Sequence, residues 1–266
     1  MSDPLAPLIA SLHAQGRLRV WSLVITAFGD LVQYRGGEIS LARLGRLLGR
    51  IGVEQGALRT ALSRLARDGW VVSDRRGRAS FYRLSAQGID RFGPATSRIY
   101  AAPADSGITL WSLALRLDAP GGSGVTLRPA GAPPAPSDLR LTGSIDHISD
   151  AYRAALLGDA HRAALAGLAT DLAALDTQIS DPLDAAAARL LLIHRWRRIV
   201  LRYDEILPDL MPGDAPLGDP RRAVADAYRG LAPAAEHWLG TADGDLGAMP
   251  PADTSFAARF GGLHHA

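Results

Sequence analysis

The sequence predicts an α+β protein in which helices and a hairpin come first, a small sheet follows, and further helices complete the chain. Three observations support this fold class. Apolar residues recur at helical spacing in the N-terminal quarter, short β-rich runs between Pro and Gly residues occupy the middle, and Ala/Leu-rich segments fill the remainder. With 266 residues and a hydrophobic content of 47%, the chain can bury substantial cores.

The N-terminal part predicts three helices. Val20 to Val32 has apolar residues at helical spacing and predicts a buried helix. Ser40 is a favourable N-cap for a second helix, and a third is expected from about Glu54 to Asp68. The expected outer side of the second helix carries Arg43, Arg46 and Arg50. The expected inner stripe of the third helix consists of Leu58, Ala61, Leu62 and Leu65.

A hairpin should follow the third helix. Residues 70–72 and 80–82 are rich in β-forming side chains and flank the basic turn Arg75-Arg76-Gly77-Arg78. Ser85 is expected to cap a short helix that ends near Phe92. Beyond it, residues 94–106 have the Pro, Ala, Ser and Gly content of a linker, which would close a first domain.

The rest of the chain predicts a small sheet and then helices. Short strands are expected at 108–117, 125–128 and 139–141. Helices are expected at about 146–157, 160–178, 183–204 and 220–239, and the last two begin at the capping pairs Asp181-Pro182 and Asp219-Pro220. The tail after Gly240 should be irregular. The predicted domains are 1–93, 105–180, which is expected to dimerise, and 181–266.

Charge is distributed unevenly along the chain. All 29 basic residues other than histidine are arginines, and ten of them lie between Ser40 and Ser85 with only three acidic residues. The remainder of the chain is mildly acidic, so one small part is expected to bind a polyanion. The absence of cysteine excludes disulfides and thiolate metal sites. Because no basic leader and no long apolar run is present, we expect a cytoplasmic protein without a membrane partner.

The basic segment has the pattern of a winged helix-turn-helix, in which the third helix enters the major groove and the hairpin forms the wing. Any soluble amphipathic helix also has a charged outer face, so the helix alone leaves both interpretations open. The hairpin favours double-stranded DNA, because arginines gathered at its tip would repel one another without an anionic partner. The residues predicted to contact DNA are Arg43, Arg46, Arg59, Thr60, Ser63, Arg64, Arg67, Arg75, Arg76, Arg78 and Ser80.

These motifs resemble the PaaX family, repressors of phenylacetic acid degradation. The resemblance is carried by residues 22–26, 29–30, 35–38 and 58–70, by the hairpin at 77–84, and by 191–202 with Leu207-Pro208 and Pro212. It implies a winged helix-turn-helix, a ferredoxin-like (Cas2-like) middle domain and a helical C-terminal domain. It also implies a dimeric repressor of aromatic catabolic genes that an aryl-CoA or acyl-CoA effector, such as phenylacetyl-CoA, releases from operator DNA.

The middle domain departs from that family pattern. Between Leu117 and Val125 the chain is too short for the crossover helix of a ferredoxin-like unit, so this domain should be reduced or rebuilt. A CoA effector carries phosphates, and its site should therefore offer arginines. The candidate effector-binding residues are His194, Arg197, Arg198 and Arg202. The alternatives are that these arginines pair with nearby acids and that His194 is a packed histidine.

An enzyme is not expected. The chain lacks a G-x-S-x-G elbow and an H-E-x-x-H motif, and a phosphate-binding G-x-x-x-x-G-K-[ST] loop is impossible without lysine. No cofactor and no metal site are predicted. Two alternatives remain: a DNA-binding protein without an effector, and a Cas2-like metal-dependent nuclease that uses Asp118 at the end of the first middle strand.

Overall fold

The computed structural model describes residues 3–14, 16, 18–117, 124–134, 136–175, 179–244 and 246–263. Its helices are α1 (Ala6–Ala14), α2 (Val20–Ala27), α3 (Leu41–Arg50), α4 (Gln55–Arg67), α5 (Ala86–Ile99), α6 (Asp150–Leu156), α7 (Asp159–Leu175), α8 (Pro182–Val200), α9 (Pro220–Gly240) and α10 (Thr254–Ala257). Shorter helical turns are η1 (Phe28–Val32), η2 (Gln33–Arg35), η3 (Pro208–Leu210) and η4 (Arg259–Gly261). The strands are β1 (Glu38–Ser40), β2 (Val71–Arg76), β3 (Ala79–Leu84), β4 (Trp111–Arg116), β5 (Gly124–Pro129) and β6 (Leu139–Gly143).

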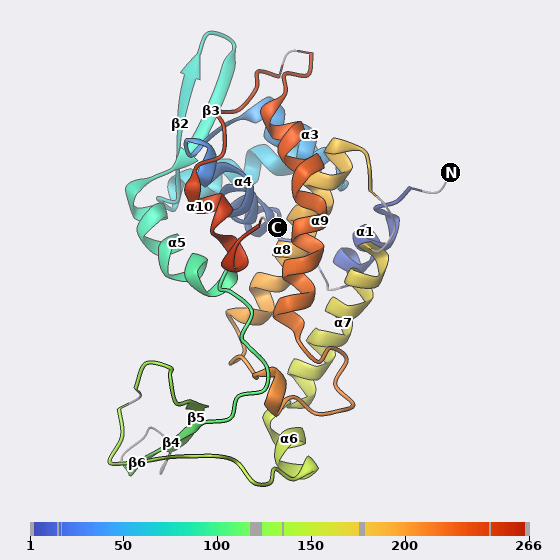
Figure 1. Cartoon of the computed structure of the whole chain (residues 1–266). Coiled ribbons are helices and arrows are strands. Elements are labelled where there is room, and N and C mark those ends of the chain that lie inside the picture. The colour runs from blue at the N-terminus through green and yellow to red at the C-terminus, as the bar shows by residue number, and fades with distance from the viewer. Residues whose placement is uncertain are drawn as a thin grey trace.

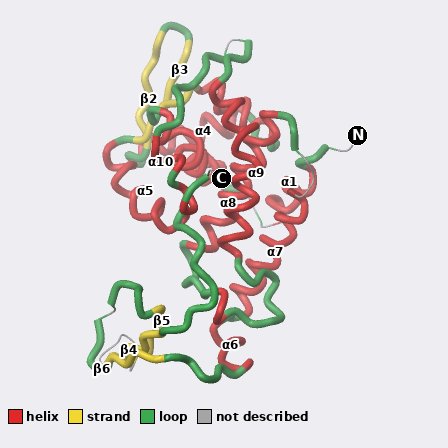
Figure 2. The backbone as a smooth tube through the Cα atoms, in the orientation of Figure 1, coloured by secondary structure: helices red, strands yellow, loops and turns green. Residues whose placement is uncertain are grey.

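The mixed helix and sheet content confirms the α+β class. Most helices gather around α8 and α9, which run side by side through the centre of the body, while β4, β5 and β6 lie at one end, apart from it (Figure 1). Among the described residues, the named strands form two sheets, one that contains the β2–β3 hairpin and this distant one (Figure 2). Within the described residues, no helix is long and apolar enough to cross a lipid bilayer.

Between Ser40 and Leu84 the helices and the hairpin agree with the sequence prediction, whereas α1 and β1 were not predicted. The Ser40 hydroxyl accepts a hydrogen bond from the backbone N–H of Arg43 and caps α3. Gly52, at a φ of +85°, allows the turn into α4, where a side chain would be strained. After α4 the chain forms the β2–β3 hairpin, and β1 pairs with the other edge of β3, so the antiparallel order is β1-β3-β2. A helix pair and a three-stranded sheet therefore share the basic segment.

Helix α5 is longer than expected. The Ser85 hydroxyl caps it as predicted, by accepting from the backbone N–H of Gly88, but the helix continues through Pro94 to Ile99 instead of ending near Phe92. A proline removes one backbone hydrogen bond from a helix. Tertiary contacts compensate here, because Ile99 is buried and its carbonyl accepts a hydrogen bond from Trp196 Nε1 at 2.9 Å.

The distant sheet has the order β5-β4-β6 and is antiparallel throughout. Its register places aliphatic side chains in two rows on one face: Leu127, Leu113 and Leu141 in one row, and Val125, Leu115 and Leu139 in the next. Among them Leu113, Val125, Leu139 and Leu141 are exposed. We call this the aliphatic face. Helices α6 and α7 follow β6, and Asp118 lies outside the described residues.

One continuous buried cluster holds the helical body together. It includes Leu23 of α2, Leu44 of α3, Leu190 of α8 and Tyr228 of α9, so both ends of the chain contribute to it. Helix α8 is buried from Ala185 to His194 with almost no exposed side chain. The three domains expected from the sequence stay a prediction, and residues of all three belong to this cluster, the middle one through Leu157, Leu165 and Leu168.

A network of buried charges lies inside that cluster. Asp30 of η1 has a fully buried side chain and accepts hydrogen bonds from Arg189 of α8 at 3.2 Å and Arg259 of η4 at 3.0 Å. Arg189 also pairs with Glu236 of α9 at 2.7 Å, and Arg35 donates to the same carboxylate. The hydroxyls of Tyr34, Tyr100 and Tyr228 complete the network. The tail expected to be irregular thus contributes a structured, buried arginine.

Candidate nucleic-acid interface

Helix α4 presents the polar face predicted for it. Leu58, Ala61, Leu62 and Leu65 are buried, which confirms the inner stripe. The opposite face is solvent-exposed and carries Arg59, Thr60, Ser63, Arg64 and Arg67. The apolar stripe holds the helix against α2 and α3, so these polar side chains project from a rigid support.

The arginines of α4 have weak partners. Arg64 and Arg67 each lie 3.6 Å from a carboxylate oxygen of Asp68, and their side chains are 63% and 76% exposed. Ion pairs this exposed contribute roughly 0–1 kcal/mol, so they cost little to exchange for a phosphate or a base edge. Thr60 donates its hydroxyl to the carbonyl of Gly56 at 2.9 Å. Its hydroxyl oxygen still has acceptor capacity.

The arginines of the hairpin are not equivalent. Arg76 donates to both carboxylate oxygens of Glu38, at 2.6 and 2.8 Å, and its guanidinium lies 4.7 Å from the ring centroid of Phe81. Arg75 donates to the carbonyl of Gly77 at the turn. Arg78 projects from the tip, and among the described residues no carboxylate pairs with it. Ser80, half-buried on β3, lies opposite Arg75.

Arg43 corrects the sequence prediction. Its side chain, expected on the outer face of α3 and in contact with DNA, is 1% exposed. It donates hydrogen bonds to the carbonyls of Trp238, Thr241 and Gly247 at 2.5 to 3.0 Å. Its guanidinium also lies 4.8 Å from the Trp238 ring centroid. By contrast Arg46 is exposed and pairs with Asp243 at 3.1 Å. Arg43 is therefore a structural residue, and Arg46 stays a candidate.

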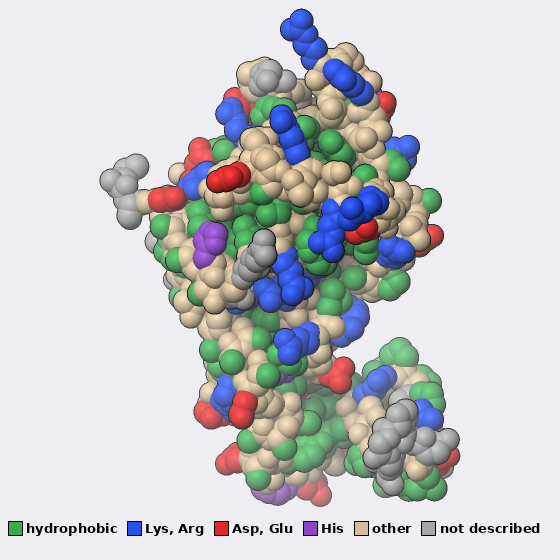
Figure 3. Space-filling view, turned by 180° about the vertical axis from the view of Figure 1, so that it is seen from behind, with side chains coloured by type: hydrophobic (Ala, Val, Ile, Leu, Met, Phe, Trp, Pro, Cys, Tyr) green, Lys and Arg blue, Asp and Glu red, His purple; other side chains and the backbone are tan. Residues whose placement is uncertain are grey.

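A large groove opens between α4 and the C-terminal half of α8. Its volume is about 1120 Å³, and its described wall residues come from α1, α2, α4 and α8, from the segment before α2 and from the residues directly after α8. Three of the four predicted effector residues line it, namely His194, Arg198 and Arg202. The face seen in Figure 3 carries arginine side chains across its middle. We call this hollow the α4–α8 groove.

Arg197 and His194 both contact the hydroxyl of Thr26, but only His194 lines the groove. Arg197 is not among the groove residues, because it donates to the carbonyl of Ser22 and to the hydroxyl of Thr26, both on α2. The ring Nδ1 of His194 lies 3.0 Å from the same hydroxyl. Burial, followed by the charges of Arg197 and its neighbours on α8, lowers the pKa of His194 to about 3. His194 is therefore neutral at physiological pH.

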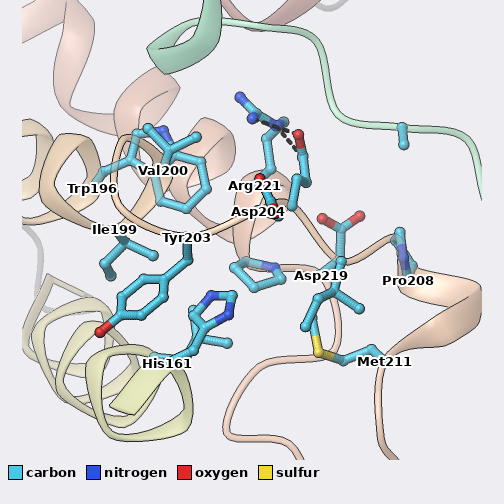
Figure 4. Close-up of a pocket in the computed structure, with 15 residues that line it drawn as sticks. His161, Trp196, Ile199, Val200, Tyr203, Asp204, Pro208, Met211, Asp219 and Arg221 are labelled. Atoms are coloured by element: carbon cyan, nitrogen blue, oxygen red, sulfur yellow. Dashed lines mark hydrogen bonds and ion pairs between the residues drawn. The ribbon is translucent and has the colours of Figure 1, made fainter. Parts of the chain in front are cut away.

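A second hollow, on the opposite side of α8, is almost filled by its own side chains. His161 and Tyr203 stack with ring centroids 4.4 Å apart, and Trp196 closes the other wall (Figure 4). Arg221 pairs with Glu205 beside them. The free space of about 30 Å³ holds roughly one or two water molecules. An organic ligand would therefore have to displace these side chains.

Sequence reasoning missed several groove residues. Leu18, Arg19 and Trp21 line the groove around the start of α2, far in sequence from Arg198. A single basic residue before a helix gives no signal that it will face another helix nearly 180 positions later. Among the described residues, no group of three or more histidine and acidic side chains could hold a metal ion.

The chain has known relatives. The PaaX-like protein family matches residues 19–88, and the PaaX-like protein C-terminal domain matches residues 147–241. The transcriptional repressor PaaX of Escherichia coli (strain K12) is 31% identical over 287 aligned positions, which cover 91% of this chain and 90% of that protein. The first family match includes α2, α4 and the β2–β3 hairpin, and the second includes α7, α8 and α9.

Proposed function

We propose that this chain, which belongs to the PaaX-like protein family, is a transcriptional repressor that binds operator DNA through a winged helix-turn-helix. The observation that carries the proposal is the juxtaposition of two exposed basic elements. Helix α4 presents Arg59 and Arg64 from a buried apolar stripe, and the β2–β3 hairpin that follows it directly presents Arg78 at its tip.

Each element has a role that its geometry supports. Helix α4 would lie in the major groove, where Arg59 and Arg64 suit the O6 and N7 acceptors of guanine, and Thr60 and Ser63 suit either base. The hairpin would act as the wing and lay Arg75 and Arg78 along phosphates or into the minor groove. Repression then needs only occupancy of the operator, with no catalytic residue and no cofactor.

A homodimer is the form in which we expect DNA binding. The aliphatic face of the distant sheet exposes Leu113, Val125, Leu139 and Leu141, and no charged side chain belongs to its two rows. Such a face would pack against the same face of a second copy by two-fold symmetry without placing like charges together. The sheet would thus replace the ferredoxin-like, Cas2-like module implied by the family, and the dimer would read a palindromic site in the nucleoid of a bacterial cytoplasm.

The proposal has two further parts. An aryl-CoA or acyl-CoA thioester would release the repressor from DNA, and the genes that the repressor controls would be aromatic catabolic genes of the phenylacetate type. The E. coli relative supports repression, since it is a transcriptional repressor. The presence of His194, Arg198 and Arg202 in the α4–α8 groove supports a site for an anionic effector. A DNA-binding protein without an effector is the alternative outcome. Nothing observed favours the nuclease alternative.

A gel-shift titration on DNA upstream of the chain's own gene tests this function. The wild type should bind, and phenylacetyl-CoA should release it at moderate salt. Arg59→Ala/Arg64→Ala should bind weakly, whereas Arg162→Ala/Arg222→Ala should bind like the wild type, because Arg162 and Arg222 pair with acids outside the interface. Binding without release would contradict the effector. Equal binding by both double variants would contradict the assignment of α4.

Sedimentation of the full chain tests the dimer. Leu141→Asp places a charge on the aliphatic face, so a second copy could pack there only by burying an unpaired carboxylate. The variant should sediment as a monomer under conditions in which the wild type is dimeric, and Arg128→Asp, on the opposite face of the sheet, should stay dimeric. A monomeric wild type, with and without DNA, would contradict the proposal.

A further inference from the structure

The distant sheet has a polar face opposite the aliphatic face. Alternation along its strands places on that side the residues Arg128 and Thr126 of β5, Arg140 and Thr142 of β6, and Ser112 and Ala114 of β4. The same residues line a hollow of about 300 Å³, which we call the sheet hollow. Basic side chains are visible on this sheet, apart from those of the body (Figure 3).

The strand register arranges these side chains around β4. In the row of Ser112 the arginine comes from β5 and the threonine from β6, whereas in the row of Ala114 the arginine comes from β6 and the threonine from β5. The Cα atoms of the two arginines are therefore roughly 12 Å apart, since strands are spaced by about 4.8 Å and successive rows by about 7 Å. Side chains as long as arginine can reach from both edges of the sheet to one ligand above β4.

The connection between β5 and β6 forms a roof over this face. The two strands lie on opposite sides of β4 and run in the same direction, because each is antiparallel to β4. The chain must therefore pass β4 to join them. Pro133 and Pro134 of this connection line the hollow together with Ala114, whose side chain is buried although it lies on a three-stranded sheet. The small floor residue and the roof leave an enclosed space between the two arginines.

The charges and donors of the sheet hollow favour an anion over a cation. No Asp or Glu belongs to the described residues that line it. Guanidinium groups only donate hydrogen bonds and stay charged, and the hydroxyls of Ser112, Thr126 and Thr142 can donate as well. Among the described residues no carboxylate pairs with Arg128, and Arg140 donates to the neutral hydroxyl of Ser137 at 3.3 Å. A negative ligand would therefore find two charged donors and several hydroxyls.

We infer that the sheet hollow binds a small phosphorylated molecule, such as a sugar phosphate, with the phosphate between Arg128 and Arg140. Phosphate offers acceptor oxygens on several sides, and arginine binds it through charge-assisted, often bidentate hydrogen bonds. The threonines would donate from the other two corners and Ser112 from the floor. This site rests neither on DNA binding nor on the α4–α8 groove.

The size of the hollow limits the ligand, and its position gives the ligand a consequence. About 300 Å³ is at the lower end of the range for ligand sites, so only a compact molecule fits. Strands β5 and β6 are the two edges of the sheet. An anion held by an arginine from each edge would link them, and a ligand that binds only the folded sheet should make local opening of the sheet less frequent.

Calorimetric titration of the full chain without DNA tests the site. The wild type should bind ribose 5-phosphate but not ribose, and inorganic phosphate should bind more weakly because it lacks the sugar. Arg128→Ala/Arg140→Ala should weaken ribose 5-phosphate by about tenfold or more through lost charge-assisted contacts. Arg162→Ala/Arg222→Ala, which removes the same charge elsewhere, should bind like the wild type. Absence of binding by the wild type would overturn the site and leave its arginines as charges that protect the sheet edges.

Two further variants separate a built site from general attraction by positive charge. Thr126→Val keeps the charge and nearly the shape but removes a hydroxyl donor, so it should weaken binding by about two- to tenfold. Arg198→Ala/Arg202→Ala, in the basic α4–α8 groove, should leave binding unchanged. Unchanged affinity in Thr126→Val would contradict the assigned geometry. Loss of binding in the groove variant, with none in the variant of the sheet arginines, would place the ligand in the groove and overturn the inference.

Hydrogen exchange of the full chain locates the ligand. Ribose 5-phosphate should slow amide exchange in β4, β5 and β6 and leave α8 and α9 unchanged. Slower exchange in α2 and α8 instead would overturn the site. If a short duplex of random sequence protected the sheet and ribose 5-phosphate did not, the polar face would be a DNA surface and the inference would be wrong. A chain that bound ribose 5-phosphate in the sheet but no operator would contradict the proposed function and keep this site.

Discussion

Arginine is used in opposite ways in two regions of this molecule. On α4 and the hairpin, Arg59, Arg64 and Arg78 are exposed and have weak partners or none among the described residues. In the centre of the body, Arg189 and Arg259 are buried and satisfied by carboxylates, tyrosine hydroxyls and carbonyls. The exposed arginines can exchange their partners for DNA. The buried arginines cannot, because their carboxylate partners would lose a compensating charge inside the protein. Burial and partners, not residue type, decide which role an arginine has.

The largest expected effect comes from the buried set. Arg189→Met removes one of the two arginine partners of both Asp30 and Glu236 and should lower the free energy of unfolding by about 3–5 kcal/mol, because two buried ion pairs are broken and Arg259 and Arg35 alone remain to compensate the carboxylates. Urea denaturation followed by circular dichroism measures it. Arg59→Met is the matched control and should change stability by less than about 0.5 kcal/mol. If both variants lost a similarly small free energy of unfolding, the buried arginine would be no more important for stability than the exposed one, contrary to the prediction.

A second pair of variants, Arg59→Ala and Arg43→Ala, tests whether an arginine that binds DNA and an arginine that stabilises the fold are distinct. Arg59→Ala should weaken specific DNA binding by about 1–3 kcal/mol, the worth of a bidentate base contact, and leave stability unchanged. Arg43→Ala should leave DNA binding unchanged and cost about 1–3 kcal/mol of stability, since three carbonyls lose a donor and that of Trp238 is buried. Anisotropy on the folded protein and urea denaturation report the two quantities. If the Arg43→Ala variant folded but lost operator affinity, the assignment of a purely structural role to Arg43 would be contradicted.

His194 provides a smaller effect that depends on pH. Its pKa is about 3 in the folded protein and about 6.5 in the unfolded chain, so below pH 6.5 the unfolded state binds a proton that the folded state does not. Stability should therefore fall as the pH decreases from about 6 toward 4, by up to about 1.4 kcal/mol per pH unit from this group. The variant His194→Asn, which can keep the contact with Thr26, should have a flatter profile in denaturation at several pH values. Identical slopes would show that other groups cause the acid sensitivity.

The smallest expected effect separates two arginines of the wing. Arg78→Ala should reduce the slope of log Kd against log salt by about 0.9, the value for one phosphate contact. Arg76→Ala should change it little, because Arg76 is already paired with Glu38. Anisotropy at four or five salt concentrations resolves the difference. If Arg76→Ala had the larger effect, Arg76 would exchange Glu38 for a phosphate when DNA binds, and the distinction between a paired Arg76 and a DNA-contacting Arg78 would be wrong.

Local features of this protein were predictable from the sequence. The capping residues Ser40, Ser85, Asp181 and Asp219 all accept the expected backbone hydrogen bond. The inner stripe of α4 and the described strands other than β1, which was not predicted, also agree, because periodicity and turn residues act within a few positions. The exposed face of α4 follows directly from its stripe, so the core of the candidate DNA interface was predictable too.

Long-range features were not predictable. Arg43 has the spacing of an outer residue on α3, yet α9 and the segment after it cover that side, with carbonyl partners 195 to 204 positions later in the chain. The walls of the α4–α8 groove likewise come from residues far apart in the sequence, Thr60 and Arg198 for example. Amphipathic spacing says which side of a helix can face water, but not which side a distant segment will cover.

The buried position of Asp30 also has a consequence for folding during translation. Its carboxylate is paired with Arg189 and Arg259, which are translated 159 and 229 residues later. At about 5–20 residues per second, the second partner follows Asp30 from the ribosome by on the order of 10 to 50 s. Until Arg189 emerges, η1 can be packed only at the cost of an unpaired buried charge, and until Arg259 emerges it can be packed with only one of its two arginine partners. A nascent chain should therefore keep this turn hydrated, and the helices around it open, until its last arginine has emerged.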